Sequence, residues 1–206
     1  MMTHYTLLQY AIPRNYMLHF LQACNTHLEY FVSADDLLGD QDNHPISEVH
    51  EIFDLTSNEF KTIAVRINPF KRMVLFYKAR TNKALDVQWK AGPNYVDYTG
   101  CTTLTEFLDL YLSPENPNYG SQNSVNTAPF YSTADGTIKV TYLLDFDNFN
   151  VDVRTIPEFA TVDNVDYLSE GHAACEGYKA LYTDADKIKV AEVFAVDIAA
   201  WDYTFE

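Results

Sequence analysis

The chain has 206 residues, of which 47% are hydrophobic and 21% are charged, and its formal net charge is −15 at pH 7. This length suits one domain with a sizeable core, and this composition excludes disorder over most of the chain. The negative charge opposes non-specific binding to nucleic acid or to an anionic membrane.

The chain shows no signs of export or membrane insertion. No window approaches 18 apolar residues, so a transmembrane helix is not expected. The N-terminus has no basic region followed by an apolar run, so we expect no signal peptide. Cys24, Cys101 and Cys175 are an odd and sparse set, which favours a reducing compartment. We therefore expect the protein in the cytoplasm or within a virion.

The N-terminal third begins with a predicted strand over residues 4–12. Pro13 is favourable in the first turn of a helix, and apolar residues then recur at helical spacing, so residues 13–27 predict an amphipathic helix. A short helical turn is expected between Ser33 and Gly39, and a further helix after Ser47.

Residues 61–90 carry eight basic side chains against one acid, Asp86, which is a net charge of +7 in a very acidic chain. Apolar residues alternate on both sides of the turn at 68–71, and again from Leu85 to Trp89. The stretch therefore predicts a three-stranded antiparallel meander, with one face on the core and basic residues on the other face and at the strand ends.

The middle of the chain combines a helix with a long loop. Thr103 and Glu106 have the spacing of a capping box, which predicts a helix from there to Tyr111. Residues 113–129 contain internal prolines and many Asn and Ser residues, and a loop of this length is uncommon within a domain. We interpret it as an assembly arm or a linker. The expected organisation is one domain over 1–206, with a subdivision into 1–112 and 130–206 as the alternative.

The last third repeats the alternating pattern. A second hairpin is predicted over residues 137–156 with Asp147-Asn148 as its turn, followed by a helix over 169–182 and one or two C-terminal strands. These elements predict an α+β fold class, with antiparallel sheets built from hairpins or meanders at about 61–90 and 137–156 plus the C-terminal strands, and three to five short helices.

The basic meander is the main candidate contact surface. Its cationic and aromatic side chains suit a protein partner with an acidic surface, such as a second copy of the chain or another assembly subunit. Equally, the basic residues could only decorate an exposed sheet face. Nucleic acid is a less favoured partner because the rest of the chain carries −22. The predicted partner-binding residues are Arg66, Lys71, Arg72, Lys78, Arg80, Lys83, Lys90, Phe70, Tyr77 and Tyr119.

Two sets of residues are candidate metal sites, but we expect neither a metal nor a cofactor. Cys24 with His27 and His172 with Cys175 both have i, i+3 spacing, which makes them a candidate zinc set. Cysteines more often fill cores as small apolar groups. The acidic segment from Asp145 to Asp152 offers oxygen ligands for calcium but lacks an EF-hand loop, so a solvated hairpin tip is the preferred interpretation.

No motif of a known enzyme class is present, so no catalytic residue is assigned. Cys175 beside His172, or Cys101 before a helix, would be the nucleophile of a thiol-dependent enzyme. The leading hypothesis is a non-enzymatic structural protein that acts by self-association or docking, in its sharpest form a component of a bacteriophage or other viral particle. The alternatives are an acidic inhibitor that imitates nucleic acid and, third, the thiol-dependent enzyme.

Overall fold

The computed structural model describes residues 4–8, 12–28, 30–33, 60–82, 96–117, 126–132, 137, 139–162 and 166–205. The chain forms two compact units, and each of them is assembled from two separate stretches of sequence. Unit 1 comprises residues 1–67 and 127–169, and unit 2 comprises residues 68–126 and 170–206. The chain therefore passes between the units three times, at boundaries that differ from the subdivision expected from the 113–129 segment.

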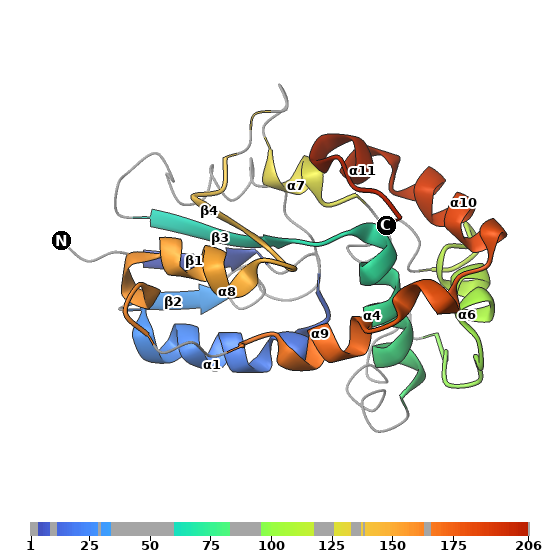
Figure 1. Ribbon diagram of the computed structural model, residues 1–206, viewed down its shortest axis with the longest axis horizontal. Coiled ribbons are helices and arrows are strands. Elements are labelled where there is room, and N and C mark those ends of the chain that lie inside the picture. The colour runs from blue at the N-terminus through green and yellow to red at the C-terminus, as the bar shows by residue number, and fades with distance from the viewer. Residues whose placement is uncertain are drawn as a thin grey trace. The chain divides into compact units, whose positions relative to one another are not determined.

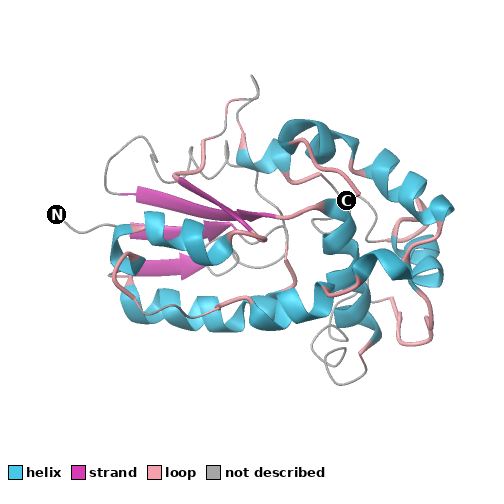
Figure 2. Cartoon of the chain, viewed as in Figure 1, coloured by secondary structure: helices cyan, strands magenta, loops and turns pink. Residues whose placement is uncertain are grey.

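Unit 1 is built on a four-stranded sheet with the order β2-β1-β3-β4 (Figure 1). All three strand pairs are parallel, so the four magenta arrows of Figure 2 share one direction. The strands are β1 (His4–Leu8), β2 (Tyr30–Ser33), β3 (Phe60–Arg66) and β4 (Tyr142–Asp145). Because β3 lies beside β1 on the side away from β2, the order of the strands reverses between β1 and β3.

The sequence of β3 explains its central position. Ile63, Ala64 and Val65 are consecutive and all buried, so both faces of the strand are covered. A strand of a parallel sheet has this continuous apolar character because helices cover both faces. Before β4 begins, Thr141 and Thr62 already join the two segments, since each backbone N–H donates to the other side-chain hydroxyl.

Helices of unit 1 contact one another through aromatic side chains. The ring of Phe20 on α1 lies 4.8 Å from that of Phe149 on α8 and 5.9 Å from that of Phe159 on η4. Phe159 also meets Tyr167 edge to face. These contacts place α1, α8 and η4 together. The helical elements of unit 1 are η1 (Arg14–Met17), α1 (Leu18–His27), α7 (Ala128–Tyr131), α8 (Phe149–Asp152), η3 (Val153–Thr155) and η4 (Pro157–Phe159).

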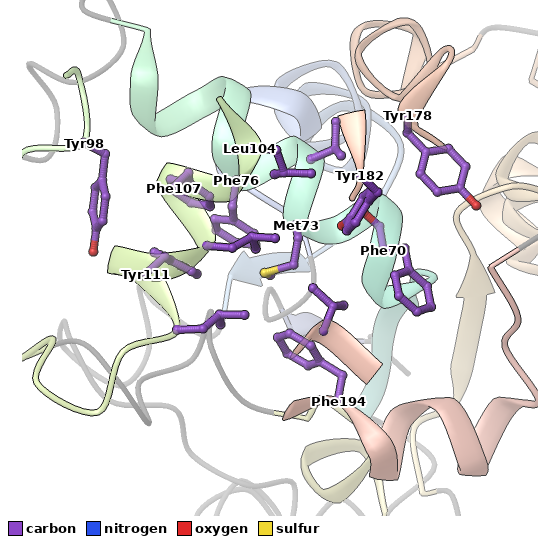
Figure 3. Close-up of a cluster of buried hydrophobic side chains, with 14 residues drawn as sticks. Phe70, Met73, Phe76, Tyr98, Leu104, Phe107, Tyr111, Tyr178, Tyr182 and Phe194 are labelled. Carbon is purple, nitrogen blue, oxygen red and sulfur yellow. The ribbon is translucent and has the colours of Figure 1, made fainter. Parts of the chain in front are cut away.

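The described residues of unit 2 form helices and loops and include no strand. Its elements are α4 (Pro69–Thr81), α6 (Leu104–Tyr111), α9 (Ser169–Cys175, whose first residue closes unit 1), η5 (Tyr178–Leu181), α10 (Asp184–Val193) and α11 (Ala195–Trp201). Its core is rich in aromatic side chains (Figure 3). Within that core Tyr111 stacks on both Phe107 and Phe76, at ring separations of 4.8 and 5.9 Å. Such rings contribute large buried areas.

Helix α4 forms because its first residues are a strong start signal. The side chain of Asn68 accepts a hydrogen bond from the backbone N–H of Phe70, and Pro69 occupies the first helical position. From Arg72 to Phe76 every residue is buried. A helix that is apolar on most sides and buried in a core shows no clear helical period, and this explains why its sequence resembles a strand.

The α+β fold class and its antiparallel hairpins are wrong. Residues 69–81 form a helix in place of the second strand of the meander. The expected turn at Asp147-Asn148 instead leads from β4, which pairs in parallel with β3, into α8. The expected C-terminal strands are the helices α10 and α11, because α10 begins with a capping box at Thr183.

Several local predictions are confirmed. The helix expected over 13–27 is present as η1 and α1, and the capping box of Thr103 and Glu106 begins α6. The helix over 169–182 is divided into α9 and η5 by Gly177, which has a φ of +64°. The turn after Ser33, the helix after Ser47 and the strand at 85–89 fall outside the described residues.

Candidate functional site

The carboxyl ends of β1, β3 and β4 lie at one edge of the sheet, because the three strands are parallel and paired in register. The chain leaving β1 runs through η1 and α1 towards β2, on one side. The chain leaving β3 returns to the sheet as β4, on the other side. In open parallel sheets such a switch point is the usual place for a ligand, because the diverging connections leave a crevice outside the strand ends.

Arg66 is a cationic side chain at this edge. It is the last residue of β3, and its partner position on β4 is Asp145. The Nε atom of Arg66 lies 3.0 Å from Oδ2 of Asp145, with 35% of the arginine side chain and 15% of the aspartate side chain exposed. The sheet also holds the backbones together here, since the N–H of Phe146 donates to the carbonyl of Arg66. The pair is therefore a product of the strand register.

Two further aspartates surround this ion pair. Oδ1 of Asp145 accepts the backbone N–H of Asp147 at 2.9 Å, and Oδ2 of Asp152 accepts the backbone N–H of Asp145 at 2.8 Å. This is the segment interpreted from sequence as an acidic hairpin tip. The structure makes it a turn between β4 and α8, in which the carboxylates accept hydrogen bonds from backbone N–H groups.

The first helical element after β1 is η1. Pro13 precedes it, and the carbonyl of Pro13 accepts the backbone N–H of Tyr16. η1 continues without interruption into α1. The N-terminal end of such a segment carries partial positive charge, which favours an anion nearby.

The structure separates the predicted partner-binding residues. Arg72 and Phe70 are buried in unit 2, so neither presents its side chain to a partner. Lys71, Lys78, Arg80 and Tyr77 are half-buried on α4, whereas Arg66 ends β3. Tyr77 donates to the carbonyl of Thr102, and Lys78 donates to that of Ala174. Lys83, Lys90 and Tyr119 lie outside the described residues.

The residues of the candidate zinc set belong to different units. Cys24 and His27 are on α1 of unit 1, whereas His172 and Cys175 are on α9 in unit 2. Cys24 is fully buried, and burial raises the pKa of its thiol well above the ordinary value. Across the described parts of the chain, no three His, Cys, Asp or Glu side chains are grouped so as to hold a metal ion.

The two candidate nucleophilic thiols are both shielded from solvent, Cys175 more than Cys101. Burial raises the pKa of Cys101, and the carboxylates of Glu106 and Asp97 raise it further. Cys175 is buried, and its thiol lies 3.8 Å from the carbonyl of Lys71 as a weak donor.

Sequence reasoning selected Arg66 but missed its partner. Asp145 was assigned to a hairpin tip, because its neighbour in space follows from the parallel register of β3 and β4 and not from nearby sequence. A second unforeseen contact is the hydrogen bond of 2.6 Å from the hydroxyl of Tyr5 to Oε1 of Glu158. The near-continuous apolar run of β3 was the one sequence signal for a parallel sheet.

Comparison with known proteins gives no relative. No family model, no curated protein and no solved structure matches the chain. The helices that the structure describes include none that is long and apolar enough to cross a membrane.

Proposed function

We propose that the protein binds a small anionic ligand that carries a phosphate group, such as a mononucleotide, at the carboxyl edge of the unit 1 sheet. The observation that carries this proposal is the reversal of strand order between β1 and β3, at the edge where Arg66 ends β3. The general rule for doubly wound parallel sheets supports a ligand at this position by analogy of fold.

The chemistry of the edge suits an anion. A guanidinium group presents several N–H donors in a plane that matches phosphate oxygens, and Arg66 keeps part of its side chain exposed. The nearby aspartates limit the number of anionic groups that fit, so a ligand with one phosphate is preferred to a polyphosphate.

Calorimetric titration with inorganic phosphate and a panel of ribonucleoside monophosphates tests the proposal at physiological ionic strength. We expect saturable binding by wild type and a loss of about tenfold to a hundredfold in affinity for Arg66→Gln, because the cation proposed to contact the phosphate is removed. Lys187→Gln is the matched control. Lys187 also has 35% of its side chain exposed and pairs with an aspartate, Asp184, in unit 2.

Equal affinities for Arg66→Gln and wild type would contradict the proposal, as would the lack of any saturable binding. Weaker binding by Lys187→Gln to the same extent would assign the effect to overall charge instead of to this edge.

A structural or assembly role remains the second candidate. The meander on which it was based is a strand and a helix, but Ile188 on α10 and Val196 on α11 are 60% and 50% exposed. Exposed apolar side chains favour association where they are contiguous. Mass measurement in solution over a range of salt tests it, and a monomer at all concentrations would contradict self-association. The acidic inhibitor stays a prediction, which competition with nucleic acid for a shared enzyme would test.

A further inference from the structure

Asp145 is held by hydrogen bonds that do not involve Arg66. Its Oδ1 accepts the backbone N–H of Asp147 and its own N–H donates to Asp152, so both its side chain and its backbone are held. Only 15% of its side chain is exposed. A carboxylate held in this way is a rigid support, and a ligand does not displace it without breaking these bonds.

Arg66 is held near Asp145 by charge. Its Nε atom is covered from solvent, makes no hydrogen bond with the described residues and lies 3.0 Å from Oδ2 of Asp145 as an ion pair, while 35% of the side chain remains exposed. The exposed part therefore belongs to the rest of the side chain, which includes both terminal NH₂ groups. Four of the five N–H donors of a guanidinium are on those two groups, and an end-on phosphate uses them.

We propose that Asp145 is a positioning residue, which holds Nε of Arg66 so that the two terminal NH₂ groups face the ligand at the carboxyl edge of the sheet. This inference rests on the proposed function, because it assigns the orientation of that site's cation. Without Asp145 the arginine samples several rotamers, and ligand binding must then order it. Ordering one long side chain weakens binding by about twofold to tenfold.

The negative charge of Asp145 weakens the binding of an anion, whereas its contact with Arg66 should strengthen it. A pair of variants at Asp145 separates these two effects on affinity. Removing the carboxylate also removes its repulsion of an anion, and both Asp145→Asn and Asp145→Ala do so equally. Only Asp145→Asn keeps an oxygen that can contact Nε of Arg66. The two variants can also differ in the bond that Asp145 accepts from the N–H of Asp147, and this difference is the same whichever residue is at position 66. The change in the ratio of the two dissociation constants between the Arg66 and Arg66→Lys backgrounds therefore reports positioning.

The experiment is calorimetric titration of the full chain with inorganic phosphate and with the tightest monophosphate of the panel. We expect Asp145→Ala to bind about fivefold more weakly than Asp145→Asn. In an Arg66→Lys background, which has no Nε, we expect the two variants to bind equally. Asp184→Asn is the control for removing one negative charge, because Asp184 is exposed and lies in unit 2. If Asp145→Ala fails to fold, Asp145→Leu replaces it, since leucine keeps the volume and lacks the acceptor.

The outcomes distinguish the two proposals. If Arg66→Gln weakens binding but Asp145→Ala binds as tightly as Asp145→Asn or more tightly, Asp145 has no positioning role and the binding edge stands. If Arg66→Gln binds like wild type, or wild type does not bind, the proposed function fails and the role of Asp145 fails with it.

Discussion

Two arginine–aspartate pairs lie on either side of the junction between β3 and α4, and they differ mainly in burial. Arg66 pairs with Asp145 in unit 1 with a third of its side chain exposed, whereas Arg72 lies 3.7 Å from Asp197 in unit 2 with both side chains 1% exposed. The comparison shows that the secondary-structure element of a basic residue decides whether its side chain is buried or exposed. The end of a strand leaves one guanidinium accessible, and the buried face of a helix encloses the other.

The environment of Arg72 is aromatic. Its guanidinium lies 5.9 Å from the ring centre of Phe76 and 5.3 Å from that of Phe194. Cation–π contacts and the carboxylate of Asp197 together compensate the cost of removing this charge from water. The backbone N–H of Asp197 in turn donates to the side chain of Asn126, so the buried pair connects three segments of unit 2.

The largest expected effect is the loss of Arg72. Arg72→Ala leaves the buried carboxylate of Asp197 without this cation, and we expect unfolding to become easier by about 3–5 kcal/mol, measured by urea denaturation. The double variant Arg72→Met with Asp197→Leu removes both charges and should recover most of this loss. If Arg72→Ala were as stable as wild type, the buried pair would contribute no more to the free energy of unfolding than an exposed pair does, and the comparison would be contradicted.

Asp186 sharpens the comparison, because this buried carboxylate is satisfied by neutral groups. Oδ2 accepts the N–H and hydroxyl of Thr183 and the hydroxyl of Thr105. Burial raises the pKa of Asp186, but these hydrogen bonds outweigh burial, and the pKa is lowered. A lowered pKa means that the folded state favours the carboxylate. Its stabilisation is complete above the unfolded pKa of about 4 and is lost as the pH falls through the lower folded value.

Asp186→Asn should therefore destabilise the protein by about 1–2 kcal/mol at neutral pH, as expected for a damaged cap. The difference from wild type should shrink in thermal denaturation as the pH falls below the unfolded pKa of about 4, because the wild-type carboxylate becomes protonated at a lower pH than in the unfolded chain. Glu192→Gln, at an exposed position of the same helix, is the control. A difference that does not change with pH would contradict the role of the charge.

How much of this could be predicted from sequence depends on the range of the interaction. The capping box at Thr103 and the helix at 13–27 were predicted because their signals lie within a few residues. The parallel pairing of β3 with β4 was not, because it joins segments about 80 residues apart. Long-range register has no local sequence signal, and the Arg66–Asp145 pair depends on it.

The strand predicted within residues 69–81 was wrong for another reason. The apolar residues of 73–76 alternate as well as they recur at helical spacing, since the segment is buried on most sides. The signal that decided the outcome was Asn68-Pro69, a cap followed by proline at the first helical position, which was interpreted as a turn. A short apolar run of this kind predicts a helix or a strand equally well, so the residues on either side of it must decide between the two predictions.

The N-cap of α4, Asn68, provides a further test, because it lies at the boundary between β3 and α4. The side chain of Asn68 accepts from Phe70 and donates to the carbonyl of Thr204 at 2.8 Å, both within unit 2. We expect Asn68→Ala to cost about 1 kcal/mol in urea denaturation, and Asn68→Asp, which keeps the cap, to cost less. Equal loss in both variants would mean that the bond to Thr204, and not the cap, is the important contact.

The smallest expected effect on stability is at Arg66. A partly exposed ion pair contributes little, because water screens the charges and holding the side chains costs entropy, so Arg66→Gln should change the free energy of unfolding by less than about 1 kcal/mol. The same variant should show the loss of phosphate binding described above. Urea denaturation and calorimetry on one preparation measure both quantities. A loss of stability near that of Arg72→Ala would place Arg66 among the structural residues, because a group that the fold needs to this degree is not free to serve a ligand.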